Sequence, residues 1–305
     1  MTDLQADLQT GAALRAATGA EPGPAGSLWG DAWREMRGRA VFWLSTLTLA
    51  IAVAMAAFPG LFARFGPNER CDLRLFNRGP GDGAIFGYDQ QGCDYWSQVV
   101  HGARASILIG IAVTVFALLI SVVLGLLAGY YGGWLDAVIG RLTDVFFGIP
   151  FVLGATVILV AFPDHGIWAM TLVLVVLGWT TMTRLMRGQV IAVRQMDYVT
   201  AARMLGAGDL RIMLKHILPN AIAPVVVLAT LNVGNVIAGE ATLDFLGVGL
   251  QYPEVSWGLQ LNAARAFYTT HPHLLIFPAV FLTATVLSFL LLGDVVRDAL
   301  DPKLR

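Results

Sequence analysis

The sequence predicts an all-α integral membrane protein with six transmembrane helices. Of its 305 residues, 56% are hydrophobic and 13% are charged, and the mean hydropathy is +0.67. Soluble globular proteins carry about 25% charged residues, so this composition argues against a soluble domain. Six uncharged runs each approach or exceed the roughly 17 residues that a helix needs to cross a bilayer. The net charge of −1 gives no reason to expect nucleic acid as a partner.

The residues before the first apolar run divide into two parts. Residues 1–26 are rich in Ala, Gly, Thr and Pro without apolar periodicity, so we expect a disordered cytoplasmic tail. Residues 27–39 place Trp29, Trp33 and Met36 on one helical face with arginines among the polar positions, which is typical of a helix lying on the inner leaflet. A cleaved secretory signal is the rival interpretation, but signals are usually ~15–30 residues long. The apolar region here begins only near Ala40, so we expect no cleavage.

The apolar runs define a transmembrane domain over residues 40–296. They are Ala40–Ala63, Ala105–Leu135, Val145–Pro163, Gly166–Thr183, Ile217–Gly239 and Leu274–Gly293. If the N-terminus lies inside, 14 of the 20 Lys and Arg residues fall in cytoplasmic segments, as the positive-inside tendency requires. Both termini are therefore predicted to be cytoplasmic, with residues 297–305 as a tail, 59–104 as an external loop and 197–220 as an internal segment.

Small residues within the runs indicate where helices meet or bend. Gly125, Gly129 and Gly133 recur every fourth residue along the second run, a spacing that lets another helix approach closely. The Gly148–Pro150 segment should bend the third run, because proline lacks the amide hydrogen and its ring clashes with the preceding turn.

Three polar residues, Asn232, Asn235 and Glu240, mark the fifth run and its outer end. Polar side chains inside a membrane protein either join helices by hydrogen bonds or line a water-filled path. We take the three as candidate pathway residues, with structural hydrogen bonds as the alternative.

A charged, helix-prone segment, Asp197–Asn220, lies between the fourth and fifth runs. In its first half, Ala201, Ala202 and Leu205 recur at helical spacing. Gly206 and the glycine two residues later provide the backbone freedom for a tight reversal. The small residues would let the surface of another protein approach the backbone.

The second half of this segment predicts another helix, Leu210–Ile217. Asp209 lies where a side-chain oxygen could cap that helix, and Pro219 suits the first turn of the next span. Basic and polar residues, Arg211 and His216 among them, keep the segment out of the bilayer.

The segment resembles the EAA loop, the coupling helix of permease subunits in ABC importers, whose pattern is Glu-Ala-Ala, three residues, Gly, nine residues, Ile-x-Leu-Pro. The residues in register are Ala201, Ala202, Gly206, Leu218 and Pro219, whereas Thr200 and His216 depart from the pattern. The amino-acid sequence of this segment is most similar to that of the C-type subunit of dipeptide and oligopeptide importers. This resemblance implies the type I ABC importer permease fold. The residues implied to couple to the ATPase subunits are Ala201, Ala202, Leu205, Gly206, Asp209, Arg211, His216 and Pro219.

Within the external loop, the stretch FGYDQQGCDYWSQVVHGARAS resembles the lead into the second span of C-type peptide permeases, where the family reads like FGTDxLGRD. Cys93 stands where that pattern has Arg, and Cys71 lies in the same loop. An extracytoplasmic location favours a disulfide between them. Two independent reduced thiols are the alternative, because the separation that decides the matter is not contained in the sequence.

Residues Glu240–Asn262 resemble the family passage EAxLSFLGLGxQPPxxSWGxML, with Phe245, Gly247 and Trp257 among the matching positions. We expect a scoop-like outer loop in which glycines form the turns. Trp257 and Tyr252 are expected at the membrane interface, where amphipathic rings prefer to lie.

The chain contains no Gly-x-x-x-x-Gly-Lys-Ser/Thr phosphate loop and no motif typical of a metal site, so we expect no enzyme activity and no bound cofactor, with ATP held by partner subunits. The resemblance implies half of a peptide pathway in the bacterial inner membrane. The implied partners are a homologous second permease, two ABC ATPase subunits or one fused ATPase, an extracytoplasmic peptide-binding protein and membrane lipid.

Other functions stay open from the sequence. Within the ABC class these are import of nickel, glutathione or antimicrobial peptides, and export. From another class, a secondary transporter would need intramembrane ionisable residues or inverted repeats, whereas the six runs hold no charge. A purely structural membrane scaffold is a more distant alternative.

Overall fold

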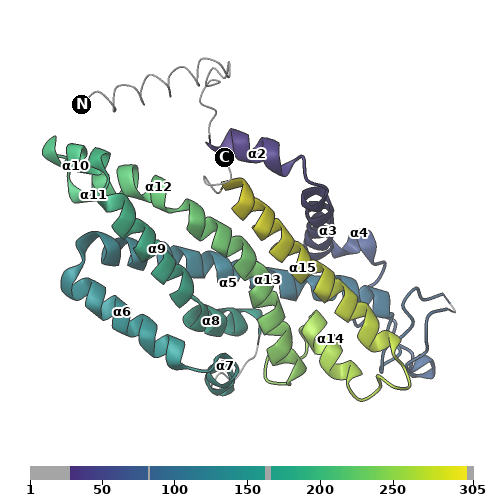
Figure 1. Ribbon diagram of the computed structural model, residues 1–305. Helices are drawn as coiled ribbons and strands as arrows, with labels where there is room; N and C mark the ends of the chain where they lie inside the picture. Colours follow the sequence, from purple (N-terminus) through teal and green to yellow (C-terminus); the bar gives the residue numbers. More distant parts are fainter. Residues whose placement is uncertain (1–27, 82, 162–165, 301–305) are drawn as a thin grey trace, which may run out of the picture.

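The computed structural model describes residues 28–81, 83–161 and 166–300, which form a helical bundle (Figure 1). The expected tail of residues 1–26 lies outside the described residues, as do residues 301–305. The helices are α2 (Leu28–Met36), α3 (Ala40–Ala57), α4 (Pro59–Phe62), α5 (Tyr95–Tyr131), α6 (Gly133–Gly148), α7 (Phe151–Val160), α8 (Ile167–Gly178), α9 (Thr180–Arg194), α10 (Asp197–Met204), α11 (Asp209–Ile212), α12 (Leu218–Ala221), α13 (Ala223–Phe245), α14 (Trp257–Ala264) and α15 (His273–Leu300), with a 3-10 turn at Leu73–Leu75 and a π-helix at Met213–Ile217.

Four of these helices, α3, α5, α13 and α15, are long and apolar enough to cross a membrane singly. Two bent pairs meet the same test together: α6 with α7, bent by 91°, and α8 with α9, bent by 44°. The number of spans therefore reaches six if each bent pair is one span, and these six follow the order of the six predicted runs.

Several bounds differ from the expected ones, and three of these differences are informative. α5 begins at Tyr95, ahead of the expected Ala105, because Asp94 caps it by accepting a hydrogen bond from the Ser97 amide at 3.0 Å. α6 begins well before the expected Val145, since its charged residues hid it from a search for uncharged runs. α15 continues past Arg297, so the expected tail begins as helix.

The bend predicted at the Gly148–Pro150 segment separates two helices. α6 ends at Gly148, where the Ile149 amide donates to the Phe146 carbonyl at 3.3 Å, and α7 starts again after Pro150. Since proline has no amide hydrogen to continue the ladder, the axis turns by 91° at this point. The predicted bend is confirmed, and it is sharper than a kink.

α5 lies at the centre of the bundle, in contact with α3, α8, α9 and α13. A Cβ at Gly125 would lie 2.7 Å from the Met186 Cβ, and one at Gly129 would lie 2.7 Å from the Val190 Cβ, so both glycines let α9 approach closely. Gly133 has no such neighbour, adopts φ +57° and is the first residue of α6, directly after the chain turns at the end of α5. The predicted glycine row therefore packs at two positions, and its third glycine begins α6.

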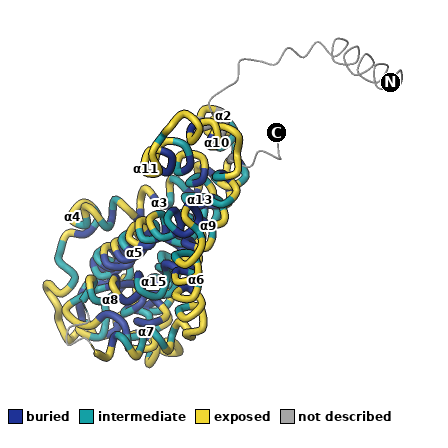
Figure 2. Tube along the Cα trace, turned by 90° about the vertical axis from the view of Figure 1, so that its left-hand side faces the viewer, coloured by how far each residue is buried: buried dark blue, intermediate teal, exposed yellow. Residues whose placement is uncertain are grey.

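Different helices mark the two ends of the bundle. α2, α10 and α11 lie at one end and α7 at the other in both views (Figures 1 and 2). Arg39, between α2 and α3, donates to Glu35 at 2.8 Å and to Asp298 of α15 at 2.7 Å. The hydrogen bond with Asp298 raises the pKa of Arg39 above its ordinary value. This ion pair fixes α2 beside the end of α15, and the place of α2 on a lipid surface stays a prediction.

Candidate coupling site and outer loop

The segment at one end of the bundle has the predicted helix–turn–helix form. α10 ends at Met204, and the Ala207 amide closes the turn by donating to the Ala202 carbonyl at 3.1 Å. Gly206 adopts φ +80°, a conformation that side chains with a Cβ rarely take, which explains the glycine here. The reversal expected from two closely spaced glycines is therefore formed, and Gly206 provides its left-handed residue.

The second half begins with Gly208 as the N-cap of α11, without a side-chain cap. The expected capping role of Asp209 is wrong. Its carboxylate lies in the first turn and accepts a hydrogen bond from the Tyr130 hydroxyl at 2.6 Å. From α11 the chain continues through the π-helix to the four-residue α12, whose first turn contains Pro219. The spanning helix α13 begins only at Ala223, so Pro219 does not lie in its first turn as expected.

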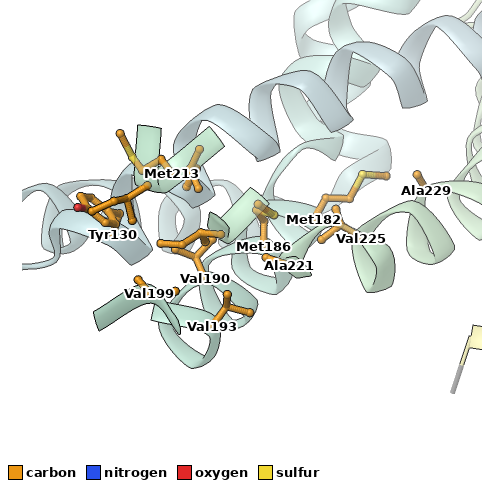
Figure 3. Packing of buried hydrophobic residues seen from close by; sticks show 13 residues of the cluster. Tyr130, Met182, Met186, Val190, Val193, Val199, Met213, Ala221, Val225 and Ala229 are labelled. Carbon is orange, nitrogen blue, oxygen red and sulfur yellow. The ribbon is translucent and has the colours of Figure 1, made fainter. Parts of the chain in front are cut away.

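Buried side chains attach this segment to α5 and α9 (Figure 3). Val199 of α10 and Ile212 of α11 are both fully buried in one cluster with Tyr130 of α5 and Val190 of α9. A buried aliphatic side chain contributes about 1.5–3 kcal/mol relative to an exposed one, so the segment is firmly attached to the bundle.

The opposite face of the segment exposes large apolar side chains. Leu205 is 89% exposed, Met204 83% and Leu210 66%. Ala201 is exposed with them, but Ala202 is buried against the bundle, so the two alanines do not share one surface as the sequence interpretation assumed. Of the other predicted contacts, Arg211 and Pro219 are exposed and His216 is half-buried.

Two ion pairs that the sequence analysis missed join α6 to α9. Arg187 binds both carboxylate oxygens of Asp136, with Nη2 2.6 Å from Oδ2, and Arg184 Nη2 lies 2.6 Å from Asp144 Oδ1. They line a cleft of about 470 Å³ between the helices. The spacing of acidic residues along one face of α6 was visible in the sequence, but their partners are 51 and 40 residues away.

The candidate pathway residues of α13 do not share one environment. Asn232 donates to Thr114 Oγ1 of α5 at 3.2 Å, which is the helix-joining alternative. Asn235 is exposed, and Glu240 is fully buried. The role of these residues in lining a pathway stays a prediction. Of the three, Asn235 has the exposed side chain that such a role requires.

Glu240 lies beside the anchor of the outer loop. One helical turn further on, Asp244 accepts hydrogen bonds from the Leu250 amide at 2.6 Å and from the Ser256 hydroxyl. Among the described residues, the carboxyl oxygens of Glu240 have no hydrogen-bond partner. No three His, Cys, Asp or Glu side chains come together as a metal site in the described ranges.

The outer loop after α13 turns at Gly247, which has φ +82°. Trp257 is fully buried, and its indole donates to the Val99 carbonyl at 2.9 Å, so the expected interfacial position of this ring is wrong. Tyr252 is 78% exposed and Phe245 is 36% exposed, and both are free to meet lipid or another chain. The buried indole packs the loop onto α5.

Cys71 and Cys93 are joined by a disulfide, which confirms the predicted pairing. Beside it, the Asp72 amide donates to the Gly92 carbonyl at 3.1 Å. A Cβ at Gly92 would clash with the Asp72 carbonyl. The two segments of the loop therefore pass so closely that only glycine fits at position 92. The disulfide closes this loop directly before α5.

The chain is similar to permease proteins of bacterial transport systems. It is 36% identical over 277 residues to the glutathione transport system permease protein GsiD of Pectobacterium atrosepticum, covering 91% of this chain and 92% of that protein. It is 36% identical over 279 residues to the oligopeptide transport system permease protein OppC of Bacillus subtilis, covering 92% and 91%. GsiD of Escherichia coli O6:K15:H31 is 37% identical over 298 residues, covering 96% and 97%.

Two solved structures share the fold. One shows inward-facing conformations of the MetNI methionine ABC transporter, with a TM-score of 0.54 and 19% identity, covering 66% of this chain and 96% of that one. The other is an amino acid ABC transporter with histidines, with a TM-score of 0.51 and 15% identity, covering 66% and 92%. The model of the family described as the binding-protein-dependent transport system inner membrane component matches residues 121–305. The chain therefore belongs to the family of inner membrane components of binding-protein-dependent transport systems, and it has the type I ABC importer permease fold.

Proposed function

We propose that this chain is one of two permease subunits of an ATP-driven importer for short peptides. The observation that carries the proposal is the shape of residues Asp197–Asn220, which we call the coupling segment. Its inner face is buried against the bundle, and its outer face is apolar and exposed. Leu205 and Leu210 expose 89% and 66% of their surface on that outer face. Exposed apolar patches of this kind mark sites where another protein binds.

The outer face suits an ATPase subunit as its partner. A Cβ at Gly206 would have no neighbour within 4 Å, so the turn is open to an approaching surface. The sequence contains no phosphate-binding loop of its own, so we assign ATP binding to two ATPase subunits or one fused ATPase. Closure of the ATPases would move the segment and favour one of two bundle arrangements.

Short peptides are the proposed substrates because the similar proteins are permease proteins of glutathione and oligopeptide transport systems. These substrates share peptide bonds, a free carboxylate and an amine. Nickel and longer antimicrobial peptides are the alternatives within the class. A peptide-binding protein would deliver the substrate at the end of the bundle that carries α14 and the disulfide-closed loop.

In the proposed orientation, the coupling segment and both termini lie in the cytoplasm. The distribution of Lys and Arg supports this orientation, with 14 of the 20 in the segments placed inside. The Cys71–Cys93 disulfide lies in the loop placed outside, in the compartment where disulfides persist.

Reconstitution tests the proposal. Proteoliposomes would contain this chain, the second permease, the ATPases and the binding protein, and uptake of labelled glutathione, di-, tri- and pentapeptides would be measured. We expect uptake only when all components and ATP are present. Mass spectrometry of ligand on the co-purified binding protein would identify the natural substrate class.

Omission of each component in turn provides the controls. A proton or sodium gradient should not replace ATP, and this chain alone should neither transport peptide nor hydrolyse ATP. Uptake by the purified single chain under an ion gradient would overturn the assignment in favour of a secondary transporter. A binding protein that carries nickel and no peptide would overturn the substrate class only.

A further inference from the structure

The turn between α10 and α11 is mechanically weak by itself. It contains two glycines within three residues, Gly206 and Gly208, and α11 is only four residues long. Glycine permits more backbone conformations than any other residue, so such a turn can pivot. Although Val199 and Ile212 attach α10 and α11 to the bundle, part of a force applied to the exposed Leu205 and Leu210 would then be lost in bending the turn. A segment that transmits force needs a brace across this turn.

Tyr130 spans the turn from the inner side. It is 4% exposed and lies one residue before the end of α5. Its hydroxyl donates to Asp209 Oδ1 of α11 at 2.6 Å. The guanidinium carbon of Arg203 in α10 lies 5.9 Å from the centre of its ring, within the range of a cation–π contact. One side chain thus contacts the helices on both sides of the turn.

The same ring also contacts α9. The guanidinium carbon of Arg194, at the end of α9, lies 5.8 Å from the ring centre. The backbone beneath Tyr130 has little freedom to shift, because a Cβ at Gly129 would already lie 2.7 Å from Val190 of α9. Tyr130 therefore stands on the closely packed contact between α5 and α9.

We propose that Tyr130 is the positioning residue that locks α10 and α11 into one rigid body and connects this body to α5. Its hydrogen bond is to a carboxylate, and such charge-assisted bonds are about twice as strong as neutral ones. α5 packs against α3, α8, α9 and α13, so a movement received at the coupling segment reaches most of the bundle through this residue. The inference rests on the proposed coupling function of the segment.

The phenol hydroxyl can be tested without disturbing the ring. Y130F removes the donor to Asp209 and keeps the packing and both cation contacts. Tyr131 is its neighbour, is 51% exposed and provides the matched control Y131F. The measurement is the number of ATP molecules hydrolysed per peptide imported by the complete system in proteoliposomes.

We expect Y130F complexes to assemble and to hydrolyse several-fold more ATP per imported peptide than the wild type, because a charge-assisted hydrogen bond no longer holds the turn. Y131F should keep the wild-type ratio. Hydrogen exchange of residues 205–211 in the assembled complex should be faster in Y130F than in Y131F, because the turn has lost its brace.

A double-mutant cycle with Asp209→Ala shows whether the two groups act as one. If they do, the double variant is no worse than Y130F alone. If instead the losses of Y130F and D209A simply add in the double variant, the two groups act independently and the brace is refuted. D209A alone provides the same readout if Y130F does not assemble.

The two hypotheses fail differently. If the wild-type complete system shows no ATP-driven import, the proposed function fails. If the wild type couples ATP to import and both Y130F and D209A do so equally well, the proposed function stands and the role of Tyr130 is refuted.

Discussion

Arg187 of α9 and Asp136 of α6 form a two-pronged ion pair, with Nη2 2.6 Å from Oδ2 and Nε bound to Oδ1. It crosses a cleft of about 470 Å³, so α6 is attached to α9 by charge over a stretch where side chains do not fill the space. The bidentate geometry suits the planar guanidinium, which matches both carboxylate oxygens at once.

Removal of this pair should loosen α6. D136N leaves the guanidinium of Arg187 without its charged partner, so we expect the free energy of unfolding to fall by about 1 kcal/mol, at the upper end for partly exposed pairs. Thermal unfolding of the purified complex measures this. R141Q is the control, because Arg141 is 88% exposed and lies 4.0 Å from Asp144. The exchange D136R with R187D should recover part of the loss. An unchanged melting temperature in D136N would show that packing alone holds α6.

Gly206→Asp should uncouple ATP hydrolysis from import. The new side chain is forced into φ +80° and places a charge on the surface that we assign to ATPase docking. Substrate-stimulated ATP hydrolysis and peptide uptake in proteoliposomes are the measurements. G206A is the control, because it adds the backbone strain without the charge. Normal coupling in assembled G206D complexes would contradict the docking assignment, and equal loss in G206A would assign the effect to the turn conformation.

A membrane-impermeant thiol reagent should not label the native chain, since both of its cysteines are in the disulfide. After reduction, wall-free intact cells should show labelling of Cys71 and Cys93, because we place their loop outside. Labelling is followed by mass spectrometry, and a denatured, reduced sample shows that the probe reaches both thiols. Labelling without a reductant would refute the disulfide in the cell. Labelling only after lysis would refute the orientation.

A methyl group at Gly129 should separate α5 from α9. Its Cβ would lie 2.7 Å from the Val190 Cβ and 2.9 Å from the Arg187 carbonyl oxygen, so the backbone must shift. Overpacking of this kind costs about 1–3 kcal/mol, and we expect a lower melting temperature for G129A. G140A is the matched control, because a Cβ there meets nothing within 4 Å and alanine favours a helix. V190A removes the Val190 Cγ1, which would also lie 2.7 Å from the new methyl group, and should relieve that part of the clash while the Cβ contact remains. A melting temperature of G129A equal to that of G140A would contradict the close contact.

The positions of the apolar segments, which give six spans if each bent pair is one span, and the helix–turn–helix of the coupling segment follow from the sequence alone. Both depend on properties of neighbouring residues, namely the length of an apolar run and the conformational freedom of Gly206. The sequence also predicted the partners of the disulfide, because the loop placed outside contains two cysteines. The short separation that lets them bond, 4.0 Å between the Cα atoms, came from the tertiary structure. The first part of α6 was not predicted, because Asp136 and Asp144 interrupt its apolar sequence. Arginines of α9 neutralise these two carboxylates, but they are 40 or more residues away, so the neighbouring sequence does not reveal the ion pairs.

The tertiary structure decided what each polar side chain does. Asp209 looks like a helix cap in sequence, yet it bonds to Tyr130, which lies 79 residues earlier. Trp257 looks like an interfacial ring, yet its indole is buried against the Val99 carbonyl, 158 residues away along the chain. Helix formation and membrane insertion are set by the chemistry of short segments. The partner of a hydrogen bond is set by the packing of distant helices, where glycines allow contact and buried polar groups must be satisfied.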